Sequence, residues 1–286
     1  MTSIRIEDDL EHGPALRHLV LCRPEAYNTI TMELRDELDA ALEDADADDR
    51  VKVLLLRAEG PAFCAGFGLD WSTHAQAELE TKGHTWDSVQ DIRVISRFGK
   101  TFAKLHDISK PTVAAVQGWC IAGGTDMILN ADLIVAGESA RFGYPPARVW
   151  GVPEAPWVWV ARLGLEKARR YLFTGDEISG AEAARIGLVL ECVEDEELQT
   201  RAVELARRIA LMPLNQLQMM KWLLNDVAGH MYRPDTSRLL GFMFDGVARH
   251  TQEGLDFVAR AEEVGWRQAI SERDDPFGDY GSRPRP

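Results

Sequence analysis

The strongest constraint on the fold is an alternation of apolar strand segments and amphipathic helices in the first half of the chain. Residues 15–22 (ALRHLVLC) and 51–58 (VKVLLLRA) are short apolar runs typical of buried strands. Between them, residues 31–45 carry leucines every four positions with acidic residues interspersed, which predicts an amphipathic helix. A strand, helix, strand order favours a parallel sheet with a right-handed crossover.

The same alternation repeats further along and then stops. Residues 88–106 have helical apolar spacing, residues 112–118 (TVAAVQG) indicate a strand, and a helix near 124–130 precedes a strand at 132–136. From about residue 195 the pattern is almost entirely helical. We therefore predict an α/β chain with a helical C-terminal region.

Charge and motif content argue against several classes of protein. The chain has 286 residues, with 32 Lys and Arg against 46 Asp and Glu, so its net charge of -14 gives no support to nucleic-acid binding. The four cysteines form no CxxC pair and the histidines form no HExxH motif, so we expect no metal site. The chain contains no apolar run of membrane-spanning length and no secretory signal, so we expect a cytoplasmic protein without a membrane partner.

Two turns rich in small residues are candidates for ligand contact. Residues 63–70 (FCAGFGLD) and 118–124 (GWCIAGG) each follow a predicted strand. Backbone N–H groups at such turns and helix starts can hold an anion or a developing oxyanion. The alternative for either turn alone is tight packing. Neither turn matches a phosphate-binding loop.

Four segments in order resemble the crotonase (enoyl-CoA hydratase/isomerase) superfamily, and the resemblance spans about residues 5–275. The segments are RPEAYNTIT at 23–31, SKPTVAAVQGWCIAGG at 109–124, ADLIVAGESARFGYP at 131–145 and VWGVPEAP at 149–156. The resemblance implies a crotonase-like ββα spiral core that carries the acyl-CoA site, which we assign to residues 1–199. It also implies an all-helical oligomerisation region, residues 200–275, that forms a homotrimer or a dimer of trimers. We expect the remaining residues, 276–286, to be disordered.

The resemblance further implies that the chain binds acyl-CoA thioesters and forms an enolate-like intermediate. Two backbone N–H groups, by position those of Phe67 and Gly123, would hold the thioester oxygen. CoA is then part of the substrate, so no separate cofactor is expected. The residues that we assign to CoA contact are Ala26, Ala62, Ala65 and Leu69.

The acid and base residues depart from those of a standard hydratase in this family, which uses two glutamates around a water. The position of the first is Asp126, which is one methylene shorter. The position of the second is Pro146, which has no proton to give. This departure argues against a standard two-glutamate mechanism.

Glu154 is the alternative carboxylate, because some isomerases and a dehalogenase of the superfamily place their working acid at this position. The apolar neighbours Trp150, Pro153 and Trp157 would raise the pKa of a carboxyl by desolvation. A surface glutamate on a loop is the alternative for Glu154, and a plain first-turn acid is the alternative for Asp126.

The preferred reading is an isomerase-like enzyme in which Glu154, with or without Asp126, moves a proton through an enolate. Both carboxylates together would allow hydration or dienoyl isomerisation. Arg93 stands where a dehalogenase would have its helper histidine. The other readings that we keep open are a non-catalytic acyl-CoA-binding protein and a CoA-thioester hydrolase.

Overall fold

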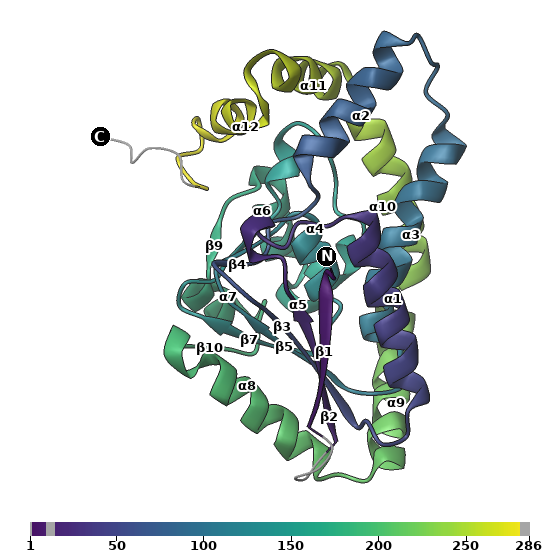
Figure 1. The fold of residues 1–286 in the computed structure, drawn as a ribbon, viewed down its shortest axis with the longest axis vertical. Coiled ribbons are helices and arrows are strands. Elements are labelled where there is room, and N and C mark those ends of the chain that lie inside the picture. The colour runs from purple at the N-terminus through teal and green to yellow at the C-terminus, as the bar shows by residue number, and fades with distance from the viewer. Residues whose placement is uncertain (1, 10–14, 281–286) are drawn as a thin grey trace.

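The computed structural model describes residues 2–9 and 15–280 and has two sheets (Figure 1). The larger sheet is parallel except where its first two strands pair in antiparallel fashion. Its strands, in spatial order, are β1 (Ile4–Asp9), β2 (Leu16–Leu21), β3 (Val53–Ala58), β5 (Thr112–Val116), β7 (Leu133–Gly137) and β10 (Glu191–Val193). The predicted parallel sheet is confirmed.

A second sheet of very short strands lies beside the first. Its order is β4 (Ala62–Cys64), β6 (Trp119–Ile121), β8 (Arg141–Gly143) and β9 (Ile178–Ser179). Strands β4, β6 and β8 each follow a strand of the larger sheet, which gives the ββ repeat of a crotonase-like spiral. The sequence pattern did not reveal this sheet, because two or three residues are too few for a recognisable period.

Helices cover both faces of the larger sheet. On one side, α1 (Met32–Ala47) and α3 (Ser88–Asp107) pack together, and Thr31 caps α1 by accepting the N–H of Leu34 at 3.2 Å. On the other side lies α8 (Asp195–Ala210), whose alanines 202, 206 and 210 recur every four residues and allow close approach to the strands.

The remaining helices complete the molecule around this core, and the C-terminal ones form the upper and right-hand parts of Figure 1. Short 3₁₀ turns occur at Pro24–Ala26 and Pro145–Arg148. The helices are α2 (Leu69–Thr81), α4 (Gly123–Ile128), α5 (Pro156–Leu163), α6 (Leu165–Thr174), α7 (Gly180–Ile186), α9 (Leu214–Tyr232), α10 (Pro234–Arg249), α11 (Gln252–Val264) and α12 (Trp266–Asp274). No helix of the described chain has the length and apolarity needed to cross a membrane.

Two boundaries differ from the sequence-based expectations. The expected division at residue 200 falls inside α8, which packs on the sheet and belongs to the core. The C-terminal helical pattern breaks at Gly265, which has φ +85 and separates α11 from α12. Periodicity alone did not reveal the break, because the apolar spacing continues across it.

The first residues of the expected tail are ordered, which corrects the expectation of disorder for residues 276–280. Arg148 donates to both carboxylate oxygens of Asp279, at 2.9 and 2.8 Å. The Tyr280 hydroxyl donates to the carbonyl of Gly175 at 2.9 Å. The segment is held by contacts with residues more than a hundred positions away, which local composition does not reveal. Residues 281–286 lie outside the described residues.

Candidate active site

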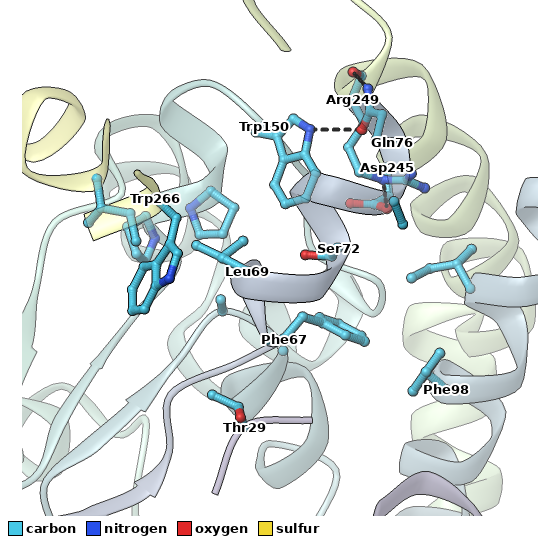
Figure 2. Close-up of a pocket in the computed structure, with 18 of the residues that line it drawn as sticks. Thr29, Phe67, Leu69, Ser72, Gln76, Phe98, Trp150, Asp245, Arg249 and Trp266 are labelled. Atoms are coloured by element: carbon cyan, nitrogen blue, oxygen red, sulfur yellow. Dashed lines mark hydrogen bonds and ion pairs between the residues drawn. The ribbon is translucent and has the colours of Figure 1, made fainter. Parts of the chain in front are cut away.

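A cavity of about 1230 Å³ lies between the two small-residue turns and the helices α2, α3, α10 and α12 (Figure 2). It brings together most of the residues selected from the sequence. Those that line it are Ala26, Ala65, Phe67, Leu69, Gly123 and Glu154. Segments from both halves of the chain therefore build one site.

The first turn directs the N–H of Phe67 away from its neighbouring segment. Ile30 forms a parallel bridge with Phe67, in which the Ile30 N–H donates to the carbonyl of Gly66 at 2.9 Å. The Gly68 N–H donates to the carbonyl of Ile30 at 3.4 Å. In a parallel bridge the residues before and after Phe67 make the backbone hydrogen bonds to Ile30. The N–H of Phe67 itself therefore points away from Ile30.

The second turn supplies the N–H of Gly123, the first residue of α4. A first helical residue has no carbonyl partner within its own helix. Ala122 before it has φ 52 and ψ -124, a conformation that costs about 1–3 kcal/mol for a residue with a side chain. Backbone strain of this kind concentrates at functional sites, and here it sets the direction in which α4 starts.

The two turns touch each other directly at Gly66. Gly66 has φ +87, and a Cβ on it would lie 3.0 Å from the Ala122 Cβ and 3.4 Å from the Gly123 nitrogen. A Cβ on Gly123 would lie 2.8 Å from ring carbons of Phe67. Glycine at both positions therefore lets the two backbones approach. The result is a pair of N–H donors at neighbouring positions in the cavity wall, an arrangement suited to an oxyanion.

Glu154 is a buried carboxylate that faces this cavity. It is 2% exposed, and neither of its carboxylate oxygens has a hydrogen-bond partner within residues 2–9 and 15–280. Burial raises the pKa of Glu154 well above its ordinary value, and the charges of Asp126 and Asp245 raise it further, while Arg249 opposes the change. A carboxyl with a raised pKa and unused oxygens can exchange protons with a ligand.

Asp126 is a second buried carboxylate, and it contacts the backbone of Glu154. It is 1% exposed, and its Oδ1 accepts the backbone N–H of Glu154 at 3.1 Å. Burial raises its pKa well above the ordinary value, and the charge of Asp245 adds to this. Asp126 is not among the side chains that line the cavity, so its position fits the orientation of Glu154 better than contact with a substrate.

A third buried carboxylate, Asp245 on α10, joins the site and was not predicted. Its Oδ1 accepts the N–H of Val152 at 3.4 Å and its Oδ2 accepts Arg249 Nε at 3.0 Å (Figure 2). Arg249 also donates to Asp91 on α3 at 2.9 Å. Burial raises the pKa of Asp245, and Arg249 opposes the change. In the sequence, Asp245 and Arg249 are four positions apart and resemble an ordinary surface ion pair of a helix.

Asp245 lies near the position where a hydratase would carry its second glutamate. A Cβ on Gly151 would lie 3.1 Å from Asp245 Oδ1 and 3.2 Å from Pro146 Cβ, so the carboxylate and the proline approach the same space. Pro146 lines the cavity. The Tyr144 hydroxyl donates to the carbonyl of Val152 at 2.8 Å and helps to fix the loop that leads to Glu154.

Ala62 corrects one assignment made from the sequence. It is fully buried in β4 and absent from the cavity lining, and its carbonyl accepts Asn28 Nδ2 at 2.9 Å. Ala62 therefore contributes to the packing of the turn rather than to a CoA contact. The same Asn28 side chain also holds the RPEAYN segment, because its Oδ1 accepts the N–H of Arg23 at 2.8 Å. Within the described chain, no group of three or more potential metal ligands occurs.

The chain is similar in sequence to proteins of one family. The family model described as "Enoyl-CoA hydratase/isomerase" matches residues 12–266. The human mitochondrial "Enoyl-CoA hydratase domain-containing protein 3" is 29% identical over 259 residues, covering 88% of this chain and 80% of that protein. The "Probable enoyl-CoA hydratase 2, mitochondrial" of Arabidopsis thaliana is 34% identical over 193 residues, which are 66% of this chain. The chain spans only 60% of that relative's length.

Solved structures agree with these relatives. A crystal structure of an enoyl-CoA hydratase from Mycobacterium smegmatis is 42% identical, with a TM-score of 0.90, and the match covers 99% of this chain and 97% of that one. An enoyl-CoA hydratase/isomerase from Xanthobacter autotrophicus Py2 is 26% identical with a TM-score of 0.85, covering 96% and 98% of the two chains. The similarity extends over the core and the C-terminal helices alike.

Proposed function

Because the chain belongs to the enoyl-CoA hydratase/isomerase family, we propose that it moves a proton within an acyl-CoA thioester through an oxyanion-stabilised enolate. The N–H groups of Phe67 and Gly123 would hold the thioester oxygen, and Glu154 would act as acid and base. The observation that carries the proposal is a buried carboxylate with two unpaired oxygens in the same cavity as these N–H donors.

The proposed reaction is isomerisation of a 3-enoyl thioester to a 2-enoyl thioester. Glu154 takes a proton from C2, and the electron pair moves toward the thioester oxygen, where the two N–H donors stabilise the negative charge. Glu154 then returns the proton to C4, so the new double bond lies between C2 and C3. One such backbone donor contributes ~10²–10³ in rate.

The single-carboxylate route is favoured over hydration by the placement of Asp126 and Pro146. Hydration in this family needs a second group that faces the water and the substrate. Asp126 accepts the N–H of Glu154 and lies outside the cavity lining, and Pro146 has no proton. Asp245 lines the cavity near Pro146, but its two oxygens already accept hydrogen bonds from Val152 and Arg249. A change in the Glu154 loop on substrate binding would be required to bring Asp126 into contact.

The end of the cavity at α12 suits CoA. Trp266 of α12 and Leu69 lie toward that end (Figure 2), and Ala26 and Arg267, the residue after Trp266, also line the cavity. An aromatic ring and a guanidinium suit the adenine and the phosphates of CoA. We propose that CoA is part of the substrate, that no further cofactor or metal takes part, and that the protein acts in the cytoplasm without nucleic-acid or membrane partners.

The exposed apolar side chains of α9 and α10 support a proposal of self-association as a homotrimer or a dimer of trimers. An uncovered face of this kind marks a protein contact in soluble proteins. The side chains include Met220, Trp222, Leu223, Leu224, Leu239 and Phe244. Light scattering of the purified protein tests the proposal, which a monomer at micromolar concentration would overturn.

The test of the activity is incubation with trans-3-hexenoyl-CoA in D₂O, followed by proton NMR, for the wild type and Glu154→Gln. We expect conversion to the 2-enoyl isomer in the wild type and its loss in the variant. Conversion that survives in Glu154→Gln would transfer the role to Asp126. Binding without exchange at C2 or C4 would favour a non-catalytic acyl-CoA-binding protein, and release of free thiol would favour a hydrolase.

A further inference from the structure

Two neighbouring hydroxyl groups on α2 differ in their hydrogen bonding. The Thr73 hydroxyl donates to the carbonyl of Leu69 at 2.6 Å, as is common for hydroxyl side chains within a helix. The Ser72 hydroxyl oxygen is buried and has no hydrogen-bond partner among the described residues. Ser72 lines the cavity, and Figure 2 shows it between Phe67 and Trp150. A buried hydroxyl without a partner is costly, which suggests that a ligand supplies the missing group.

The cavity wall beyond Ser72 is polar, and its polar side chains pair with one another. Asp245 and Asp91 both pair with Arg249, and Gln76 Oε1 accepts the indole N–H of Trp150 at 3.2 Å. All of these residues line the cavity. An alkyl chain pressed against this wall would replace water around charged groups with hydrocarbon, which is unfavourable. A hydroxyl or carbonyl group in the same place would replace the hydrogen bonds of the displaced water.

The charges of this wall select against an anionic acyl group. Asp91 and Asp245 line the cavity, and both pair with one cation, Arg249. A further carboxylate would meet an excess of negative charge. Phe98 and Ile95 of α3 provide apolar surface beside this polar region for the rest of the acyl group. The wall therefore suits a neutral group that has both apolar surface and an oxygen.

We propose that the acyl group of the substrate carries a hydroxyl or carbonyl oxygen beyond its reacting carbons, and that Ser72 donates a hydrogen bond to it. This inference rests on the proposed function, because it assumes that the thioester oxygen lies at Phe67 and Gly123. With CoA toward Trp266, the acyl group extends toward α10 (Figure 2). A hydroxyl on the acyl group can also donate to Asp245, whereas a carbonyl uses Ser72 alone.

The test compares the binding of saturated thioesters, which carry no double bond to isomerise or hydrate. Hexanoyl-CoA is titrated beside 5-oxohexanoyl-CoA and 6-hydroxyhexanoyl-CoA by calorimetry. We expect at least one oxygenated thioester to bind about fivefold more tightly than hexanoyl-CoA, as befits one neutral hydrogen bond. Ser72→Ala should abolish this preference. Ser96→Ala is the matched control on α3, outside the cavity lining, and should retain it.

Failure of this inference can be distinguished from failure of the proposed function. Equal dissociation constants for the three thioesters overturn the inference and leave the proposed function standing. A preference that persists in Ser72→Ala overturns the role of Ser72. Tighter binding of adipoyl-CoA, which ends in a carboxylate, overturns the choice of a neutral group. If no thioester binds, the inference and the proposed function fall together.

Discussion

The two halves of the candidate site use opposite kinds of chemistry. The N–H groups of Phe67 and Gly123 belong to the backbone, carry no net charge and are set by two turns that touch at Gly66. The carboxylates of Glu154 and Asp245 are titratable, and their protonation depends on burial and on one another. The backbone half is preorganised by conformation, whereas the carboxylate half is controlled by electrostatics. Each half should therefore respond differently to substitution, pH and stability.

The largest effect should come from the carboxylate half. Glu154→Gln keeps the size of the side chain but removes the proton that it transfers, so we expect kcat for isomerisation to fall ~10³-fold or more. The measurement is the rate of 2-enoyl formation at saturating substrate. Glu253→Gln, an exposed position on α11, is the control and should retain the wild-type rate. A loss of less than tenfold in Glu154→Gln would remove Glu154 from the mechanism.

The backbone half should respond to a single methyl group. In Gly66→Ala the new Cβ would lie 3.0 Å from the Ala122 Cβ, so we expect the two N–H groups to separate and kcat to fall ~10²-fold. Gly83→Ala is a matched control, because Gly83 also has positive φ (+69) but has nothing within 4 Å of the added Cβ. Equal losses in the two variants would assign the effect to backbone strain rather than to the oxyanion site.

The pH dependence should distinguish the halves further. The negative charge of Asp245 raises the pKa of Glu154, and Arg249 lowers it. Asp245→Asn removes the negative charge that raises the pKa of Glu154. It also leaves the positive charge of Arg249 less neutralised, so the pKa of Glu154 should fall. We expect the acid limb of the kcat/KM profile to move to lower pH. Asp256→Asn, exposed on α11, should not move it, and an unmoved limb in Asp245→Asn would contradict the coupling.

The smallest effect concerns the pH dependence of stability. Its sign is opposite to that expected for a carboxylate in an ion pair. The pKa of Glu154 is higher in the folded protein than its ordinary 4.5, so its contribution to stability falls as pH rises above 4.5 toward the folded value. Glutamine cannot ionise, so Glu154→Gln does not lose this stability as pH rises. We expect its free energy of unfolding at pH 8 to exceed that of the wild type by about 1 kcal/mol, with the difference vanishing near pH 4. Urea denaturation at both pH values checks this, and a less stable variant at pH 8 would contradict the uncompensated burial of Glu154.

Much of the fold followed from local patterns. The helix after Thr31, the strands around residues 51–58 and 112–118, and the long helix from Ser88 all appear where apolar spacing predicts them. The short strands β4, β6, β8 and β9 did not follow, because two or three residues are too few to show a period. The segment at 276–280 was wrongly expected to be disordered, because its stability comes from Arg148 and Gly175.

The sequence by itself determined the family and the glycines at which the two turns touch. Gly66 adopts φ +87, which favours glycine, and both Gly66 and Gly123 lack a Cβ, so these properties can be read from the motif. Only the tertiary structure decided the carboxylate half. It turned Asp126 toward the backbone of Glu154, removed Ala62 from the cavity and brought Asp245 into it. The protonation of a buried carboxylate depends on which distant residues exclude water and place charges around it, and no local pattern records them.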